Sequence, residues 1–351
     1  MEAAASVLPE PVPPPTFKKP VPMTPPLTAF DPGYLARKAA LPGKVFQLKN
    51  GNALEYFEEG SAGDPAVACF AAGGFNVSSL WTKEPVPGVR MLWVNQFGHG
   101  RSSALAAPVV FAERIPEIVE LLDALGVDKF YSLGHSCGGV YAMQLAAALP
   151  ERVLGAAILS SPGCIFHPSV SKAERKKVDT GGGGSIDAKG CWGGFVRSMM
   201  AGLYYNPDKS KDYGFAGHAC GGYACYKSKA AGGAPAAMAS DHWFVTKLLD
   251  AELYGSNSKR GLLYEMQGVW SHAGWSYDIA AIKCPCFLYV ERDGEVKESY
   301  VELNQRLIPG AELVVYEAHG HTSIAMEVAG IAAALVAGRS FAGDHSTGPQ
   351  A

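Results

Sequence analysis

The feature that most constrains the fold is a regular alternation of helix and strand patterns in the first half of the chain. Apolar side chains in 113–126 recur at the spacing of one helix face, and Gly126 suits the end of that helix. An apolar run at 129–133 is typical of a buried strand, a second helical pattern covers 140–149, and a second buried strand covers 153–160. Strands that alternate with helices build a mostly parallel central sheet with helices on both faces. The sequence therefore predicts an α/β fold.

The same patterns divide the chain into four parts. Prolines crowd residues 1–42, which predicts an irregular tail, and residues 339–351 are expected to form a loose C-terminal tail. Strand and helix patterns place the α/β core in 43–163 and 277–338. Between them, 164–276 is too long for a plain loop inside a compact domain, so we expect an inserted helical lid.

Composition excludes several classes of protein. With 48% hydrophobic and 18% charged residues in 351, the chain can build a core and is not disordered as a whole. A formal net charge of −3 without a long basic stretch argues against nucleic acid as a partner. The chain has no run of about eighteen apolar residues, so no membrane span is predicted. The N-terminus lacks the pattern of a secretory signal. We expect a soluble, cytoplasmic protein, with organellar targeting by the tail left open and the oligomeric state not indicated.

Eight cysteines are too dilute for a disulfide scaffold in a chain of this length, so thiols are expected. Cys220 and Cys225, with Cys191 and His218 nearby in the sequence, come nearest to a metal-binding pattern. No second close pair accompanies them, as a structural zinc site requires. We therefore expect no bound metal.

A candidate nucleophile lies between the strand at 129–133 and the helix at 140–149. The sequence there reads Gly134-x-Ser136-x-Gly138. A sharp strand-to-helix turn needs glycine on both sides of the serine, because a β-carbon would strike the neighbouring backbone. Such a turn exposes the hydroxyl, so Ser136 is the expected nucleophile.

A serine hydroxyl is a weak nucleophile, so it needs a base and a carboxylate that holds this base in the correct tautomer. His321 and Asp293 are predicted for these roles, because each follows a predicted strand and would emerge at the same sheet edge as the serine. Glu291 and Glu295 compete with Asp293 for the acid role, and His319 competes for the role of the base.

Other motifs resemble those of one family. Residues 94–102 (Val-Asn-Gln-Phe-Gly-His-Gly-Arg-Ser) are similar to the turn after its fourth strand, and residues 282–285 (Ile-Lys-Cys-Pro) to the lead into its seventh. Glycine also precedes His321. Together with the serine motif, these residues identify 45–338 as similar to the α/β-hydrolase superfamily. The resemblance implies the α/β-hydrolase fold with a lid, and serine at the turn argues against branches that need an aspartate nucleophile.

The resemblance further implies an oxyanion hole made of two backbone N–H groups, which we assign to Cys137 and to Gly74 or Phe75. The family's loop after the third strand usually begins His-Gly, whereas 71–76 has alanine where the histidine would stand. The implied activity is cleavage of an ester, thioester or amide bond of a small or medium acyl substrate through an acyl-serine, without metal or organic cofactor. A small-ligand receptor with little turnover and an acyltransferase are the alternatives.

Aromatic residues of the predicted lid are candidates for lining the substrate pocket. The same residues can instead form the lid's own core. They are Trp192, Tyr204, Tyr205, Trp243, Phe244, Trp270 and Trp275.

Overall fold

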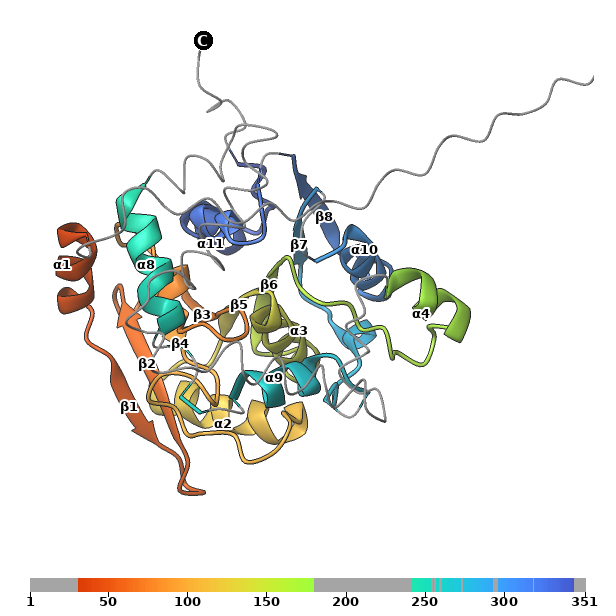
Figure 1. The fold of residues 1–351 in the computed structure, drawn as a ribbon, viewed down its shortest axis with the longest axis horizontal. Coiled ribbons are helices and arrows are strands. Elements are labelled where there is room, and N and C mark those ends of the chain that lie inside the picture. The colour runs from red at the N-terminus through yellow and green to blue at the C-terminus, as the bar shows by residue number, and fades with distance from the viewer. Residues whose placement is uncertain are drawn as a thin grey trace, which may run out of the picture.

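The computed structural model describes residues 31–179, 241–253, 255, 257–258, 261–272, 274–292, 296–317 and 319–343. An eight-stranded sheet runs through its centre in the order β1-β2-β4-β3-β5-β6-β7-β8 (Figure 1). The strands are β1 (Lys44–Gln47), β2 (Ala53–Glu59), β3 (Ala66–Phe70), β4 (Arg90–Val94), β5 (Phe130–His135), β6 (Val153–Leu159), β7 (Cys286–Glu291) and β8 (Glu312–Tyr316). β1 and β2 pair antiparallel at one edge, and β3 to β8 are parallel. The predicted α/β sheet is confirmed.

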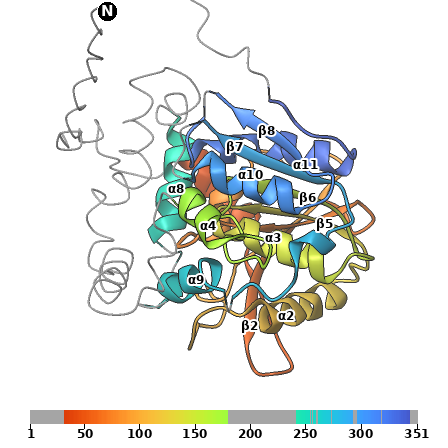
Figure 2. The same ribbon diagram turned by 90° about the vertical axis from the view of Figure 1, so that its right-hand side faces the viewer.

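Helices pack on both faces of this sheet (Figure 2). One core includes side chains of α2 (Phe111–Ala124), α3 (Cys137–Ala148), α9 (Gly261–Val269) and α10 (Glu298–Leu307). The other includes α1 (Pro32–Ala40), the 3-10 helices η1 (Val77–Leu80) and η6 (Ser323–Glu327), α8 (His242–Leu253) and α11 (Val328–Val336). The short helices α4 (Lys172–Val178) and η5 (Ile279–Ala281) complete the described elements.

The central strands are mostly apolar because both of their faces are covered. β3 and β4 are buried at every position. Successive side chains of β3 enter opposite cores: Ala68 and Phe70 belong to the core of α3, whereas Val67 and Cys69 belong to the core of α11. Parallel strands covered on both faces show such continuous apolar runs.

The predicted irregular tail contains a packed helix in its described part. Pro32 starts α1, where its missing N–H is not needed, and the Asp31 carboxylate accepts a hydrogen bond from the Tyr34 N–H at 3.0 Å. Tyr34 is fully buried, and its hydroxyl donates to the Asp250 carboxylate of α8 at 2.6 Å. The boundary at residue 42 therefore assigns a helix of the folded body to the tail, while residues 1–30 lie outside the described residues.

The beginning of the predicted C-terminal tail is also attached. Phe341 donates its N–H to the Tyr289 hydroxyl at 3.1 Å, and its carbonyl accepts from the Tyr316 hydroxyl at 3.0 Å. Its ring lies against Gly330, where an added β-carbon would overlap it. The chain is therefore anchored to the last two strands up to this residue.

In the described part of the chain between β6 and β7 lie α4, α8, α9 and η5. α8 packs on η1, and α9 packs on α3. Trp243, Phe244 and Trp270 are buried, whereas Trp192, Tyr204 and Tyr205 lie outside the described residues. The closing motion of a lid stays a prediction.

Candidate functional site

Ser136 occupies the turn that joins β5 to α3, as the glycine pattern predicted. Its φ is 53° and its ψ is −121°, a conformation that non-glycine residues rarely adopt. The turn is held by the Ser136 N–H, which donates to the Leu159 carbonyl at 2.8 Å, and by the Gly139 N–H, which donates to the Ser136 carbonyl at 2.9 Å. Strained residues of this kind persist only where their surroundings enforce them, and they cluster at functional sites.

The two flanking glycines are required by close backbone contacts. A β-carbon on Gly134 would overlap the backbone of Gly138. A β-carbon on Gly138 would overlap the carbonyl oxygens of Phe70 and Ala71. The steric reason for both glycines was predicted from the sequence, and the structure identifies the atoms that they approach.

His321 lies beside the serine turn. Nε2 of His135, which directly precedes Ser136, is 2.9 Å from the His321 carbonyl oxygen, and the two imidazole centroids are 4.7 Å apart. Burial, followed by the neighbouring His321, lowers the pKa of His135 well below its ordinary value. The imidazole of His135 is therefore neutral at pH 7, and it packs against the candidate base.

A buried carboxylate contacts the candidate base. Glu291 is the last residue of β7 and is fully buried. Its Oε1 lies 3.2 Å from Nδ1 of His321, and its Oε2 accepts a hydrogen bond from the Ser160 hydroxyl. Ser160 itself has a positive φ of 44° directly after β6. Asp293, the acid expected from the sequence, lies outside the described residues, as does Glu295, so the structure brings Glu291 to His321 and leaves Asp293 untested.

His319, the other candidate base, faces a different partner. Its Nε2 lies 3.0 Å from Oε1 of Glu327, and its ring packs against Tyr316. These contacts hold it to η6 and β8. It is therefore placed as a structural histidine.

Two N–H groups of the loop after β3 donate hydrogen bonds to acceptors within the protein. The Gly74 N–H donates to Nε2 of His99 at 3.0 Å, and the Phe75 N–H donates to the Ala72 carbonyl at 3.1 Å. Burial lowers the pKa of His99 to about 4, so its imidazole is neutral and can accept. The oxyanion roles of Gly74 and Phe75 stay predictions, and in this conformation neither N–H is free to meet a substrate.

Cys137 begins α3 beside the serine. Its side chain is buried, with Sγ 3.3 Å from the Met266 sulfur. Burial, and then the carboxyl of Glu265, raise the thiol pKa far above its ordinary value. A thiol is a poor nucleophile compared with a thiolate, which leaves the backbone N–H as the expected contribution of this residue.

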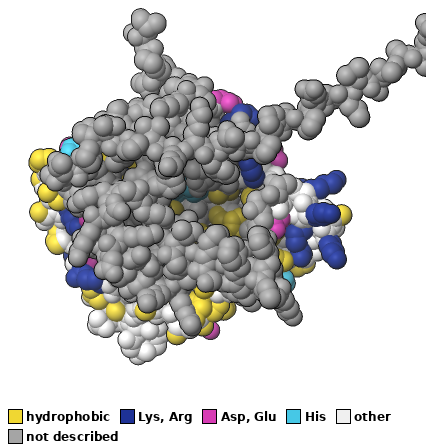
Figure 3. Space-filling view, viewed as in Figure 1, with side chains coloured by type: hydrophobic (Ala, Val, Ile, Leu, Met, Phe, Trp, Pro, Cys, Tyr) yellow, Lys and Arg dark blue, Asp and Glu magenta, His cyan; other side chains and the backbone are white. Residues whose placement is uncertain are grey.

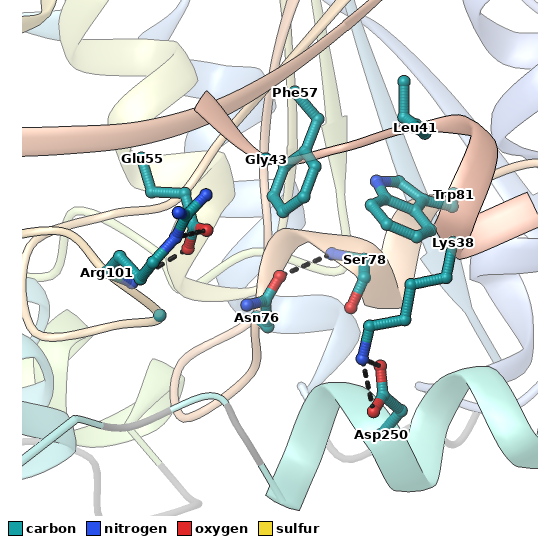
Figure 4. A pocket seen from close by; sticks show the side chains of 11 residues that line it. Lys38, Leu41, Gly43, Glu55, Phe57, Asn76, Ser78, Trp81, Arg101 and Asp250 are labelled. Atoms are coloured by element: carbon teal, nitrogen blue, oxygen red, sulfur yellow. Dashed lines mark hydrogen bonds and ion pairs between the residues drawn. The ribbon is translucent and has the colours of Figure 1, made fainter. Parts of the chain in front are cut away.

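A separate pocket of about 400 Å³ lies between α1, α8 and the loops after β3 and β4 (Figure 4). Lys38 pairs with Asp250 at 2.9 Å, and Arg101 pairs with Glu55 at 2.6 Å. Ser136 and His321 are not among its lining residues. The pocket is therefore distinct from the candidate catalytic site.

Basic side chains gather at one end of one face of the molecule. Figure 3 shows a group of Lys and Arg side chains over α4. The basic residues in the last turn of α4 are Arg175, Lys176 and Lys177.

Among the described residues, no group of three His, Cys, Asp or Glu side chains could hold a metal ion, and no helix is long and apolar enough to cross a membrane. The described cysteines, including Cys284 and Cys286, are free thiols. Cys191, His218, Cys220 and Cys225 lie outside the described residues.

Comparisons with known proteins agree with this architecture. Residues 69–182 match a family profile described as alpha/beta hydrolase fold. The crystal structure of the enol-lactonase from Burkholderia xenovorans superposes with a TM-score of 0.55 at 16% identity, over 84% of this chain and 98% of that one.

Curated relatives match a shorter part of the chain. A dihydrolipoyllysine-residue acetyltransferase component of the acetoin cleaving system of Cupriavidus necator is 28% identical over 32% of this chain and 31% of its own length. A 2-heptyl-3-hydroxy-4-quinolone dioxygenase of Rhodococcus erythropolis is 33% identical over 28% of this chain and 38% of its own. The matches thus span less than half the length of these relatives, whose names describe different activities. The sheet order, the serine turn and the profile match over residues 69–182 together show that the chain has the α/β-hydrolase fold.

Proposed function

We propose that the protein is a serine hydrolase that cleaves an ester, thioester or amide bond of a small or medium acyl substrate. The observation that carries this proposal is the contact between the strained serine turn and the candidate base: His135 touches His321, which in turn touches a buried carboxylate. A nucleophile, a base and an orienting acid at one sheet edge are the components of acyl transfer. The likeness in fold to an enol-lactonase supports hydrolysis among the chemistries of this superfamily.

In the proposed first step, the Ser136 hydroxyl attacks the substrate carbonyl while Nε2 of His321 takes its proton. The carbon–oxygen double bond opens to an oxyanion, which the Cys137 N–H stabilises. His321 then returns the proton to the leaving group, and the acyl group stays on the serine. In the second step, His321 takes a proton from water, whose oxygen attacks the acyl-serine carbonyl. The bond to the serine oxygen then breaks, His321 returns the proton to the Ser136 hydroxyl, and the acid is released.

Two carboxylates are candidates for orienting His321. Oε1 of Glu291 lies 3.2 Å from Nδ1 of His321, and this contact favours Glu291. Asp293 follows two residues later and remains the alternative predicted from the sequence. Either one would hold the imidazole with Nε2 toward the serine and stabilise the imidazolium that forms.

The proposal is tested by the hydrolysis of nitrophenyl esters of increasing chain length. The native protein should release nitrophenol with a maximum at one chain length, and Ser136→Ala and His321→Ala should each lose several orders of magnitude in kcat. The losses should not add in the double variant, because the residues act as one unit. Turnover that survives Ser136→Ala would reject the serine mechanism.

A further inference from the structure

A carboxyl group from the segment between β6 and β7 lies at the loop assigned to the oxyanion. Glu265 is on α9 and is completely buried. A β-carbon on Gly73 would come within 3.1 Å of Oε2 of Glu265 and 2.8 Å of Sγ of Cys137. The carboxyl of Glu265 and the thiol of Cys137, the residue that follows Ser136, thus approach the same side of Gly73.

Neither carboxyl oxygen of Glu265 makes a hydrogen bond of good geometry with the described residues, although the Gly74 N–H is close enough to lower its pKa. A buried polar group without a partner is costly, and a buried charge without one costs far more. Such a group in a folded protein therefore points to a partner that the described residues do not supply.

The surroundings of Glu265 keep it uncharged. His99, from the loop after β4, has Nε2 at 3.4 Å from Oε2, but this nitrogen accepts the Gly74 N–H and therefore carries no proton. On α3, the Cys137 thiol and the Tyr141 hydroxyl face Glu265, and burial raises the pKa of both groups, so both are neutral.

Arg114, the basic residue of α2, is already engaged. It contacts Glu117 at 2.9 Å and Glu113 at 3.0 Å. Burial raises the pKa of Glu265 to about 8, and the Gly74 N–H offsets only part of this effect. At neutral pH the side chain is a carboxylic acid that can donate one hydrogen bond.

We propose that Glu265 is a further catalytic residue, whose protonated carboxyl donates a hydrogen bond to the substrate's carbonyl oxygen beside the Cys137 N–H. The inference rests on the proposed hydrolase function. It also explains how an oxyanion is held when the N–H groups of Gly74 and Phe75 donate within the protein. A neutral carboxylic acid in an apolar site is an established kind of oxyanion donor in enzymes.

The proposed role gives activity a definite dependence on pH. Below about pH 8 Glu265 carries its proton and can donate, whereas above this value it is a carboxylate that cannot donate and repels the oxyanion. We expect kcat to fall as the pH rises through the alkaline range. The negative charge of the intermediate favours the protonated form and shifts this fall further upward.

Two variants separate donation from packing. Glu265→Leu keeps the volume and removes the donor, so kcat should fall by about 10²–10³-fold with little change in KM, the loss typical of one oxyanion donor. Glu265→Gln keeps an N–H donor that does not titrate, so kcat should stay within about tenfold of the native value and the alkaline fall should vanish. Glu59→Gln, a control on β2 whose carboxylate pairs with Arg37, should retain both the rate and the alkaline fall.

An unchanged kcat in a folded Glu265→Leu variant, or an alkaline fall that persists in Glu265→Gln, would overturn the inference. Far-UV circular dichroism establishes that each variant is folded. Failure of the proposed hydrolase function has a different sign, namely turnover that survives Ser136→Ala. Turnover that requires Ser136 but not Glu265 would reject only the catalytic role of Glu265.

Discussion

Replacing Ser136 by glycine should give a more stable protein than replacing it by alanine. Both variants lack the hydroxyl, so they differ only in how well they tolerate the backbone at φ 53° and ψ −121°. Alanine retains the β-carbon that makes this conformation unfavourable, whereas glycine accepts it. The comparison therefore measures the strain in the turn without a contribution from catalysis.

The magnitude follows from two opposing effects. Strain at a sparsely populated backbone conformation costs about 1–3 kcal/mol, and glycine loses about 0.5–1 kcal/mol more conformational free energy on folding than alanine. Ser136→Gly should therefore exceed Ser136→Ala in free energy of unfolding by up to about 2.5 kcal/mol. With an unfolding entropy of about 2.1 cal/mol/K per residue, this difference corresponds to a Tm up to about 3 °C higher.

Thermal and urea denaturation followed by circular dichroism would measure the difference. Ser299 supplies a matched control, because it lies in α10 with helical backbone angles, and both replacements lose the same hydrogen bond to Val178. There glycine should be the less stable replacement by about 0.5–1 kcal/mol. If Ser136→Gly is also less stable than Ser136→Ala, the turn is unstrained and the argument from its geometry fails.

Two further substitutions test the packing of the turn and the identity of the acid. Gly138→Ala should prevent folding or greatly reduce soluble yield, because its β-carbon would overlap the Phe70 carbonyl; a normally folded variant on circular dichroism would contradict this contact. Glu291→Gln should lower kcat on the order of 10²-fold or more through loss of tautomer control, as steady-state ester hydrolysis would report, and Asp293→Asn should cost much less. The reverse order would assign the acid to Asp293.

The fold could be predicted because its signals are local and agree with one another. The apolar runs of β5 and β6 flank a helix that ends before Pro150, and parallel strands covered on both faces leave this pattern in any sequence. The serine turn could also be predicted from the sequence, because only glycine fits where Gly134 and Gly138 approach other backbone atoms.

Other features depend on distances that the sequence does not contain. Glu291 and Asp293 are two residues apart at the end of a strand, and only the place where β7 ends decides which carboxylate turns toward His321. The prolines around α1 conceal it in the sequence, although Asp31 followed by Pro32 is typical of a helix start.

Glu265 was missed for a different reason. Glu265 is the one acid in the apolar helix α9, and this pattern indicates an unusual site, since charged residues are seldom buried without a partner. The sequence does not reveal that this acid packs against a loop almost two hundred positions earlier. That contact depends on how the segment between β6 and β7 folds back over the core.

The most direct test of the proposed serine chemistry is covalent labelling by a fluorophosphonate probe, followed by mass spectrometry of the digested protein. The hydroxyl of Ser136 should displace fluoride from phosphorus, so the adduct should map to the peptide that contains Ser136. His321→Ala should remain unlabelled although folded, because its serine has lost the base. A folded native protein that takes up no probe, or an adduct on another residue, would contradict the proposal that Ser136 is an activated nucleophile.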